Sequence, residues 1–175
     1  MASGESLVPA HLLSVLEQTP IIIEKILMDA PPGALEWKPA TDRWSVAEVL
    51  GHLADVEIVV RERLRRMVEE ESPAIAAYDQ NAAYAAGKYA GLGKDQLHKF
   101  CHERDRTLSW LRYQPAGAAR RTATHSELGS ITVAQLLNEW AFHDLGHIRQ
   151  IAELYRSKIF YPQMGGFQRY YTVKP

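Results

Sequence analysis

The chain has 175 residues, of which 46% are hydrophobic and 23% are charged. These proportions are typical of soluble globular proteins, and the length fits one domain, residues 1–175, which argues against disordered and fibrous classes. A formal net charge of −1 gives no overall attraction to phosphate backbones or anionic lipid, so we expect neither a nucleic-acid nor a membrane partner.

The spacing of apolar residues predicts an all-α protein. Apolar residues recur at helical intervals in four long stretches, whereas alternation with a period of two is nearly absent. Residues 7–30 form the first stretch, which Pro20 interrupts directly after the potential cap Thr19; this predicts a short helix followed by a second one. Four main helices predict a four-helix bundle.

The second main helix has a clear start signal. Ser45 and Glu48 have the spacing of a capping box, in which the serine accepts from the third helical N–H and the glutamate reaches back. The helix is predicted to run to about Glu70. Residues 71–93 then form a long connection between helices two and three, and connections of this length often carry function.

The rest of the chain completes the bundle. A third helix is predicted from about Lys94 to Tyr113, and residues 116–131 read as irregular chain. A second capping box begins at Thr132 and opens a last helix that is predicted to end near Ser157. The tail beyond it contains five aromatic residues, which we expect to pack back on the body.

Three histidines stand on apolar helix faces. His143 and His147 are four residues apart, so on a helix both imidazoles can address one point. Both continue a stripe of apolar residues that faces the bundle interior, and His52 lies on a similar stripe of the second helix. Each could be a core histidine held by a hydrogen bond. A transition metal would instead satisfy all three imidazoles and leave positions for water.

Two known metal motifs fit poorly. His143 and His147 resemble the two histidines of the zincin motif, but Asp144 replaces its glutamate and no histidine follows His147. A phosphohydrolase site built on His-Asp pairs needs a later aspartate, and Asp144 is the last one in the chain. The remaining histidines are predicted to lie at the surface or at caps: His11, His98, His102 and His125.

The sequence shows neither a membrane-spanning segment nor a signal peptide, and this indicates the cellular compartment. No apolar run approaches the roughly 20 residues that cross a bilayer, and residues 1–6 have no signal-peptide character. The single cysteine, Cys101, fits a reducing environment. We therefore expect a cytoplasmic protein.

Several segments together resemble the DinB-like (DinB/YfiT-type) family of metal-dependent proteins. The similarity covers nearly the whole chain and is carried by residues 44–55, 77–80, 129–132, 140–151 and 166–170, with 125–128 as a weaker match. The resemblance implies a four-helix bundle in which His52, His143 and His147 bind zinc, nickel or a similar divalent ion, frequently as a homodimer. Characterised relatives include enzymes that use a low-molecular-weight thiol as thiolate.

Two functions stay open at this point. In the first, the ion activates a low-molecular-weight thiol or water for attack on a small electrophilic substrate, as in a thiol S-transferase or a hydrolase. Candidate catalytic or supporting groups are Asp79, Tyr78, Glu48 and Gln150. In the second, the protein is a non-catalytic metal-binding or stress-response bundle whose ion is structural. A fourth protein ligand would favour the second function.

Overall fold

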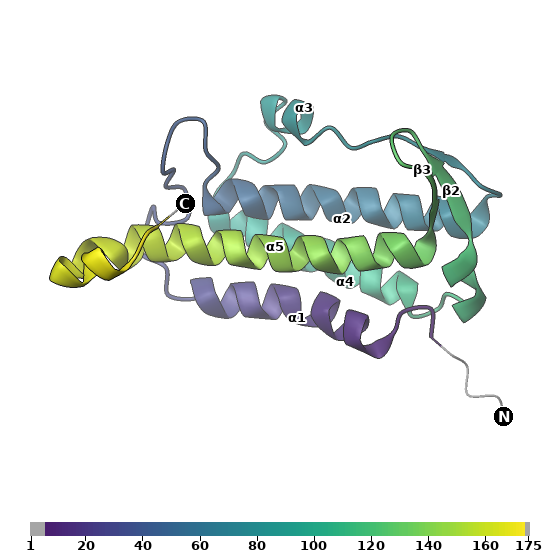
Figure 1. The fold of residues 1–175 in the computed structure, drawn as a ribbon, viewed down its shortest axis with the longest axis horizontal. Coiled ribbons are helices and arrows are strands. Elements are labelled where there is room, and N and C mark those ends of the chain that lie inside the picture. The colour runs from purple at the N-terminus through teal and green to yellow at the C-terminus, as the bar shows by residue number, and fades with distance from the viewer. Residues whose placement is uncertain (1–5, 174–175) are drawn as a thin grey trace.

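The computed structural model describes residues 6–173, which form a bundle of four long helices (Figure 1). The predicted fold class is confirmed. The connection after the second long helix carries the short helix α3 (Gln80–Ala85) and runs back along the bundle, so that α4 points in the same direction as α2. None of the helices within residues 6–173 could span a membrane. The long helices are α1 (Ala10–Leu27), α2 (Val46–Glu69), α4 (Gly93–Leu111) and α5 (Val133–Ile159).

Both predicted capping boxes form, and they fix the starts of the two helices that carry the three histidines. Ser45 Oγ accepts from the backbone N–H of Glu48 at 3.2 Å, and Glu48 Oε2 accepts from the backbone N–H of Ser45 at 2.8 Å. Thr132 and Gln135 do the same at the start of α5. These bonds satisfy N–H groups that a helix start leaves without partners.

The predicted break at Pro20 is wrong, because α1 continues through it. A proline inside a helix removes the N–H that would bond to the carbonyl four residues earlier, here that of Leu16. Arg104 on α4 supplies the missing donor, since its Nη1 lies 2.6 Å from the Leu16 oxygen. A side chain from another helix therefore stabilises the proline-containing turn.

Residues 116–131, predicted to be irregular, are ordered instead. They contain a 3-10 helix (Ala116–Arg120) and most of a hairpin, β2 (Thr122–His125) and β3 (Gly129–Thr132). Strand β1 (Ala74–Ile75) adds in parallel to β2, giving the order β1-β2-β3. The small sheet closes one end of the bundle and ties the long connection to the start of α5 (Figure 1).

The C-terminal tail also departs from expectation. After α5 it forms two 3-10 segments (Tyr161–Gln163 and Gly165–Tyr170) that extend past the end of the bundle (Figure 1). Phe167 and Tyr170 are each 66% exposed. The tail aromatics therefore do not pack back on the body as a group.

The bundle interior has a polar layer between two apolar clusters. Arg104 is 1% exposed and donates to Glu57 on α2 at 2.9 and 2.7 Å and to Asp144 on α5 at 2.7 and 2.9 Å. Trp140 Nε1 donates to the same Glu57 oxygen at 3.0 Å. One cluster includes Leu64, Leu111 and Leu137, and the other includes Leu50, Phe100 and Ile151.

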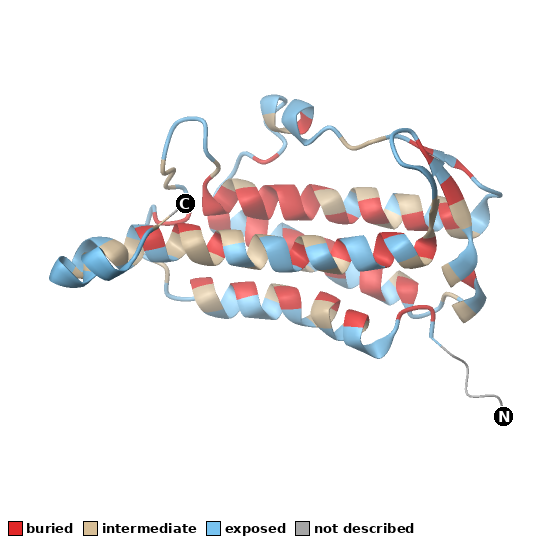
Figure 2. Ribbon diagram, in the orientation of Figure 1, coloured by how far each residue is buried: buried red, intermediate tan, exposed pale blue. Residues whose placement is uncertain are grey.

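Burial is uneven along the helices. Figure 2 shows buried residues on one side of most helices, whereas the first half of α2 is buried nearly all round. Every residue of 49–55 is buried, and His52 lies among them. The long connection covers the side of α2 that would otherwise face solvent, because Tyr89 from that connection packs against His52 and is 1% exposed.

Candidate metal centre

Helices α2 and α5 bring three histidines to one point in the bundle. His52 is 2% exposed, while His143 and His147 are half-buried and lie one turn apart on α5. His143 Nε2 lies 3.1 Å from His52 Nε2 and 3.1 Å from His147 Nε2. One ring nitrogen of each histidine lies within 4.8 Å of those of the other two, and no other His, Cys, Asp or Glu within residues 6–173 joins this group.

The Nδ1 atoms of the three histidines, which point away from the cluster, differ in their surroundings. His147 Nδ1 lies 2.8 Å from Gln150 Oε1, and His52 Nδ1 lies 3.2 Å from the hydroxyl of Tyr89. His143 Nδ1 is buried and has no hydrogen-bond partner in the described part of the chain. Because an amide oxygen only accepts, His147 carries its proton on Nδ1 and directs the lone pair of Nε2 toward the other two rings.

This arrangement fits a metal ion. A neutral imidazole has one N–H and one lone pair. The three Nε2 atoms face each other, and that of His147 offers a lone pair. Hydrogen bonds among the three rings alone therefore cannot satisfy all of them. A single cation would accept a lone pair from each. Two nitrogen ligands at about 2.0–2.1 Å from a tetrahedral ion are about 3.3 Å apart. The observed 3.1 Å is close to this separation.

The protonation state also suits ligation. Burial, and to a lesser extent electrostatic repulsion from His147, lowers the pKa of His52 to about 4 and that of His143 to about 3. Burial lowers the pKa of His147 as well, although its bond to Gln150 acts in the opposite direction. All three imidazoles are therefore neutral at pH 7, the form that binds a metal.

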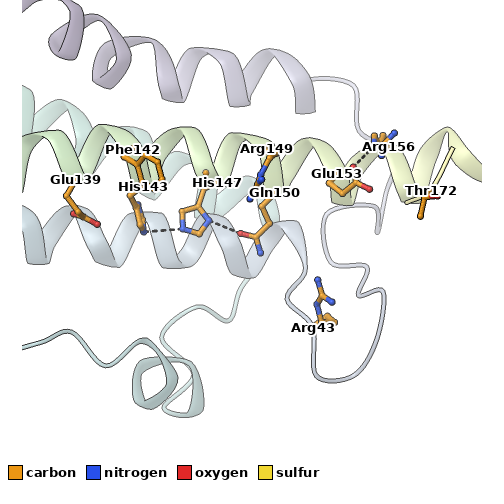
Figure 3. Close-up of a pocket in the computed structure, with 11 residues that line it drawn as sticks. Arg43, Glu139, Phe142, His143, His147, Arg149, Gln150, Glu153, Arg156 and Thr172 are labelled. Carbon is orange, nitrogen blue, oxygen red and sulfur yellow. Dashed lines mark hydrogen bonds and ion pairs between the residues drawn. The ribbon is translucent and has the colours of Figure 1, made fainter. Parts of the chain in front are cut away.

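A cleft of about 780 Å³ opens beside the α5 histidines. Figure 3 shows His143 and His147 on its wall, with Glu139 on one side of them along α5 and Gln150 and Glu153 on the other. Three arginines also line it: Arg149 and Arg156 from α5, and Arg43 from the loop before α2. The histidine cluster is thus reachable from solvent on the α5 side.

The four candidate supporting groups lie at different places. Gln150 contacts His147 directly, and the Tyr78 hydroxyl donates to Asp55 next to Tyr89. Glu48 is engaged at the start of α2 and pairs with Lys38 at 2.8 Å.

Asp79 is exposed, and its side chain caps α3 by accepting from the N–H of Ala82 at 2.9 Å. Asp79 and Glu48 therefore have structural contacts of their own.

Sequence reasoning missed several residues of the site. The spacing of four that links His143 to His147 also reaches back to Glu139, so that residue could have been found from the helix pattern. Tyr89 and Arg43 carry no such signal, because the chain path between helices brings them to the site.

The three histidines lie within a segment that matches a known family. Residues 16–151 match the model of the DinB superfamily, which covers the segments carrying all three histidines. The chain belongs to the DinB superfamily.

Two bacterial proteins are similar to this chain over most of its length. A protein of Oceanobacillus iheyensis named "Putative metal-dependent hydrolase OB0782" is 26% identical over 83% of this chain and 85% of its own length. The uncharacterized protein YuaE of Bacillus subtilis is 26% identical over 69% of this chain and 82% of its own.

Among solved structures, YfiT from Bacillus subtilis is described as a probable metal-dependent hydrolase with an unusual four-helix bundle topology. It superposes with a TM-score of 0.74 at 25% identity, over 84% of this chain and 85% of YfiT.

Proposed function

We propose that this protein is a metal-dependent enzyme in which a divalent transition ion, held by His52, His143 and His147, activates water or a low-molecular-weight thiol against a small electrophile. The observation that carries the proposal is the convergence of three Nε2 atoms beside an open cleft. An ion bound there would lower the pKa of a coordinated water or thiol and so generate a nucleophile near neutral pH. The hydrolase names of similar proteins support the same reading.

The alternative is a structural ion in a non-catalytic bundle. Structural sites are usually closed by four protein ligands, whereas catalytic sites keep a position for solvent. The group here has three candidate ligands within residues 6–173, and two of them line the cleft. Both observations favour the enzyme.

Glu139 is the carboxylate best placed to accept a proton from the attacking water or thiol. It lines the cleft one helical turn before His143. Burial raises the pKa of Glu139, with the nearby Arg63 acting in the opposite direction. A general base works best when its pKa approaches the working pH, so this shift suits the role.

The charge of the cleft indicates an anionic substrate. Arg156 pairs with Glu153, whereas Arg43 and Arg149 make no side-chain hydrogen bond or ion pair with any described residue. Guanidinium groups bind carboxylates and phosphates in a bidentate manner. We therefore propose an electrophile that carries a carboxylate or phosphate group.

The identity of the ion and the assembly state belong to the same proposal. Three imidazoles accept several first-row ions, and zinc or nickel is our choice. A low-molecular-weight thiol as co-substrate and a homodimer are proposed from the likeness to thiol-using family members.

Elemental analysis of protein purified without an affinity tag tests the metal. We expect about one equivalent of zinc or nickel per chain, with the thermal midpoint raised by low-molecular-weight thiols that occupy the open position. Protein that contains no transition metal and takes up neither ion from solution would contradict the proposed function.

The substrate charge is tested with the cobalt-substituted protein, whose visible spectrum reports ligands at the ion. We expect succinate and inorganic phosphate to change the spectrum, and Arg43→Ala or Arg149→Ala to weaken their binding about fivefold, because an exposed charge pair contributes up to about 1 kcal/mol. The control is Arg112→Ala, which replaces an exposed arginine at the C-cap of α4 and should have no effect. Equal weakening for imidazole, a neutral ligand, would contradict a charge effect.

A further inference from the structure

A chain of hydrogen bonds leads from His52 to a carboxylate outside the histidine cluster. His52 Nδ1 lies 3.2 Å from the Tyr89 hydroxyl, which lies 2.7 Å from the Tyr78 hydroxyl. The Tyr78 hydroxyl donates to Asp55 Oδ2. Asp55 is 9% exposed and lies 3.6 Å from the ammonium group of Lys88. The long connection thus supplies two hydroxyls that join two residues of α2.

The direction of every bond in this chain follows from the number of protons. An ionised carboxylate only accepts, so the single proton of Tyr78 is directed at Asp55. The contact between the two hydroxyls then requires Tyr89 to donate to Tyr78. Having used its only proton, Tyr89 can only accept from His52, which must therefore carry its proton on Nδ1. The lone pair of His52 Nε2 is then left facing His143.

A competing acceptor for Tyr89 does not change this result. The backbone oxygen of Gln80 lies 3.3 Å from the Tyr89 hydroxyl, farther than the Tyr78 oxygen. If Tyr89 donated to Gln80 instead, its oxygen would still have only lone pairs to offer His52. Either arrangement fixes the same tautomer.

The fold holds Tyr89 in place through its backbone as well as its ring. A Cβ atom added at Gly51 would lie 2.7 Å from the Tyr89 carbonyl oxygen and 2.8 Å from its Cα. The absence of a side chain at position 51 therefore lets the connection approach α2 closely, next to His52. The Tyr89 ring also packs edge-on against Trp44 and His52, with centroid distances of 5.3 Å to each.

We infer that Tyr89, backed by Tyr78 and Asp55, is a positioning residue that fixes His52 in the Nδ1–H tautomer and so directs its Nε2 lone pair to the proposed metal site. The part of this inference that concerns metal affinity rests on the proposed function. The tautomer itself is a property of the metal-free protein. Hydrogen-bond acceptors behind metal-binding histidines commonly orient the ring and contribute to affinity in this way.

The decisive experiment compares Tyr89→Phe with Tyr84→Phe. Phenylalanine keeps the ring packing at position 89 and removes only the acceptor. Tyr84 lies in the same connection and also stacks on Trp44, but its hydroxyl contacts Lys38 and Glu48 rather than the His52 chain. A general effect of losing a tyrosine hydroxyl from the connection would appear in both variants, whereas only Tyr89→Phe loses the acceptor of His52.

Two readouts are measured. Nitrogen-15 NMR of the imidazoles in metal-free protein at pH 7 should show His52 as the Nδ1–H tautomer in wild type and Tyr84→Phe, and a shift toward Nε2–H in Tyr89→Phe. The zinc dissociation constant should rise about 10- to 100-fold in Tyr89→Phe and stay near the wild-type value in Tyr84→Phe.

The possible outcomes separate the two ideas. A wild-type His52 in the Nε2–H form, or equal zinc affinity and equal tautomers in both variants, would overturn the role of Tyr89. If wild type binds no metal, the proposed function fails, and the NMR comparison still decides whether Tyr89 sets the tautomer.

Discussion

Two histidines of the candidate metal centre have a hydrogen-bond partner behind Nε2, and the third, His143, has none among the described residues. The partner of His147 is Gln150, less than one turn away on the same helix, whereas the partner of His52 comes from the long connection. His143 lies between the other two, with both 3.1 Å contacts made by its Nε2. Loss of any one ring would leave two nitrogens, too few to hold a divalent ion tightly against water.

Changing His147 to Ala is therefore expected to remove most bound metal and leave helix content largely intact. His147 is half-buried, and the apolar residues of α5 that hold the helix in the bundle, such as Trp140 and Ile151, are untouched. Metal content by elemental analysis and helix content by circular dichroism measure the two effects.

His102→Ala is the matched control. His98 and His102 are also four residues apart on a helix, but both are exposed and lie outside the cluster. This variant should keep its metal. Complete unfolding of His147→Ala would instead support an ion with a structural role.

At the level of residues, the sequence could predict the histidines because helical periodicity is local. His143 and His147 share a face through a spacing of four, and His52 lies on an apolar stripe of its own helix. Tyr89 and Arg43 could not be predicted, because they reach the site through the paths of two connections. Path and packing depend on contacts between segments far apart in sequence, such as that of Gly51 with Tyr89.

At the level of elements, the polar layer joins all four long helices. Arg104 on α4 donates to Glu57 on α2, to Asp144 on α5 and to the Leu16 carbonyl on α1. Asp144 directly follows His143. The layer therefore fixes the position of α5 relative to α2, on which the distance between His52 and the other two histidines depends.

Arg104→Leu is expected to destabilise the protein by about 3–5 kcal/mol, because removing one member of a buried ion pair leaves uncompensated charge. Two carboxylates and the Leu16 carbonyl would lose the hydrogen bonds that Arg104 donates, and Glu57 would keep only that from Trp140. The free energy of unfolding from urea titrations measures the effect, provided that the slope of this free energy against urea concentration stays unchanged.

Arg106→Leu provides the comparison. Arg106 lies on the same helix, but its side chain is 55% exposed, and its partner Glu103 also pairs with Arg61. Its replacement should change stability by less than about 1 kcal/mol. Similar losses in both variants would show that the buried layer has no special importance.

Helix starts and ends could be predicted where the signal lies in neighbouring residues. They could not be predicted where a side chain from another helix supplies a missing hydrogen bond. The capping boxes at Ser45 and Thr132 formed as expected, since each needs only residues three positions apart. Pro20 did not end α1, because Arg104 compensates for its missing N–H. The hairpin after α4 escaped notice because its strands have four residues each, too few for a clear alternation.

At the level of the whole molecule, the bundle gives the histidine cluster two unlike sides. The long connection seals the α2 side, where Tyr89 is 1% exposed, and the cleft opens the α5 side. Sealing one side removes water from His52, while the other side leaves His143 and His147 on the wall of the cleft. Burial of the cluster is expected to make the metal-free protein sensitive to acid, because it disfavours the protonated imidazoles of His52 and His143.

Stability of the metal-free protein is expected to fall as the pH drops below 6.5. Burial holds the pKa of His52 at about 4 and that of His143 at about 3, below the ordinary value of 6.5. The unfolded chain therefore takes up protons first, and stability that is present above pH 6.5 is lost as the pH falls. Each histidine contributes a slope of up to about 1.4 kcal/mol per pH unit.

Urea titrations of metal-free protein between pH 7.5 and 5 measure this slope, in a range where most carboxylates of the unfolded chain remain ionised. His143→Gln removes one titrating imidazole and should show a shallower dependence on pH. A zinc-loaded sample should lose stability only at lower pH, because the ion must be displaced before the ligands take up protons. Equal slopes for wild type and His143→Gln would contradict the expectation, because they would mean that the buried imidazole of His143 does not contribute to acid sensitivity.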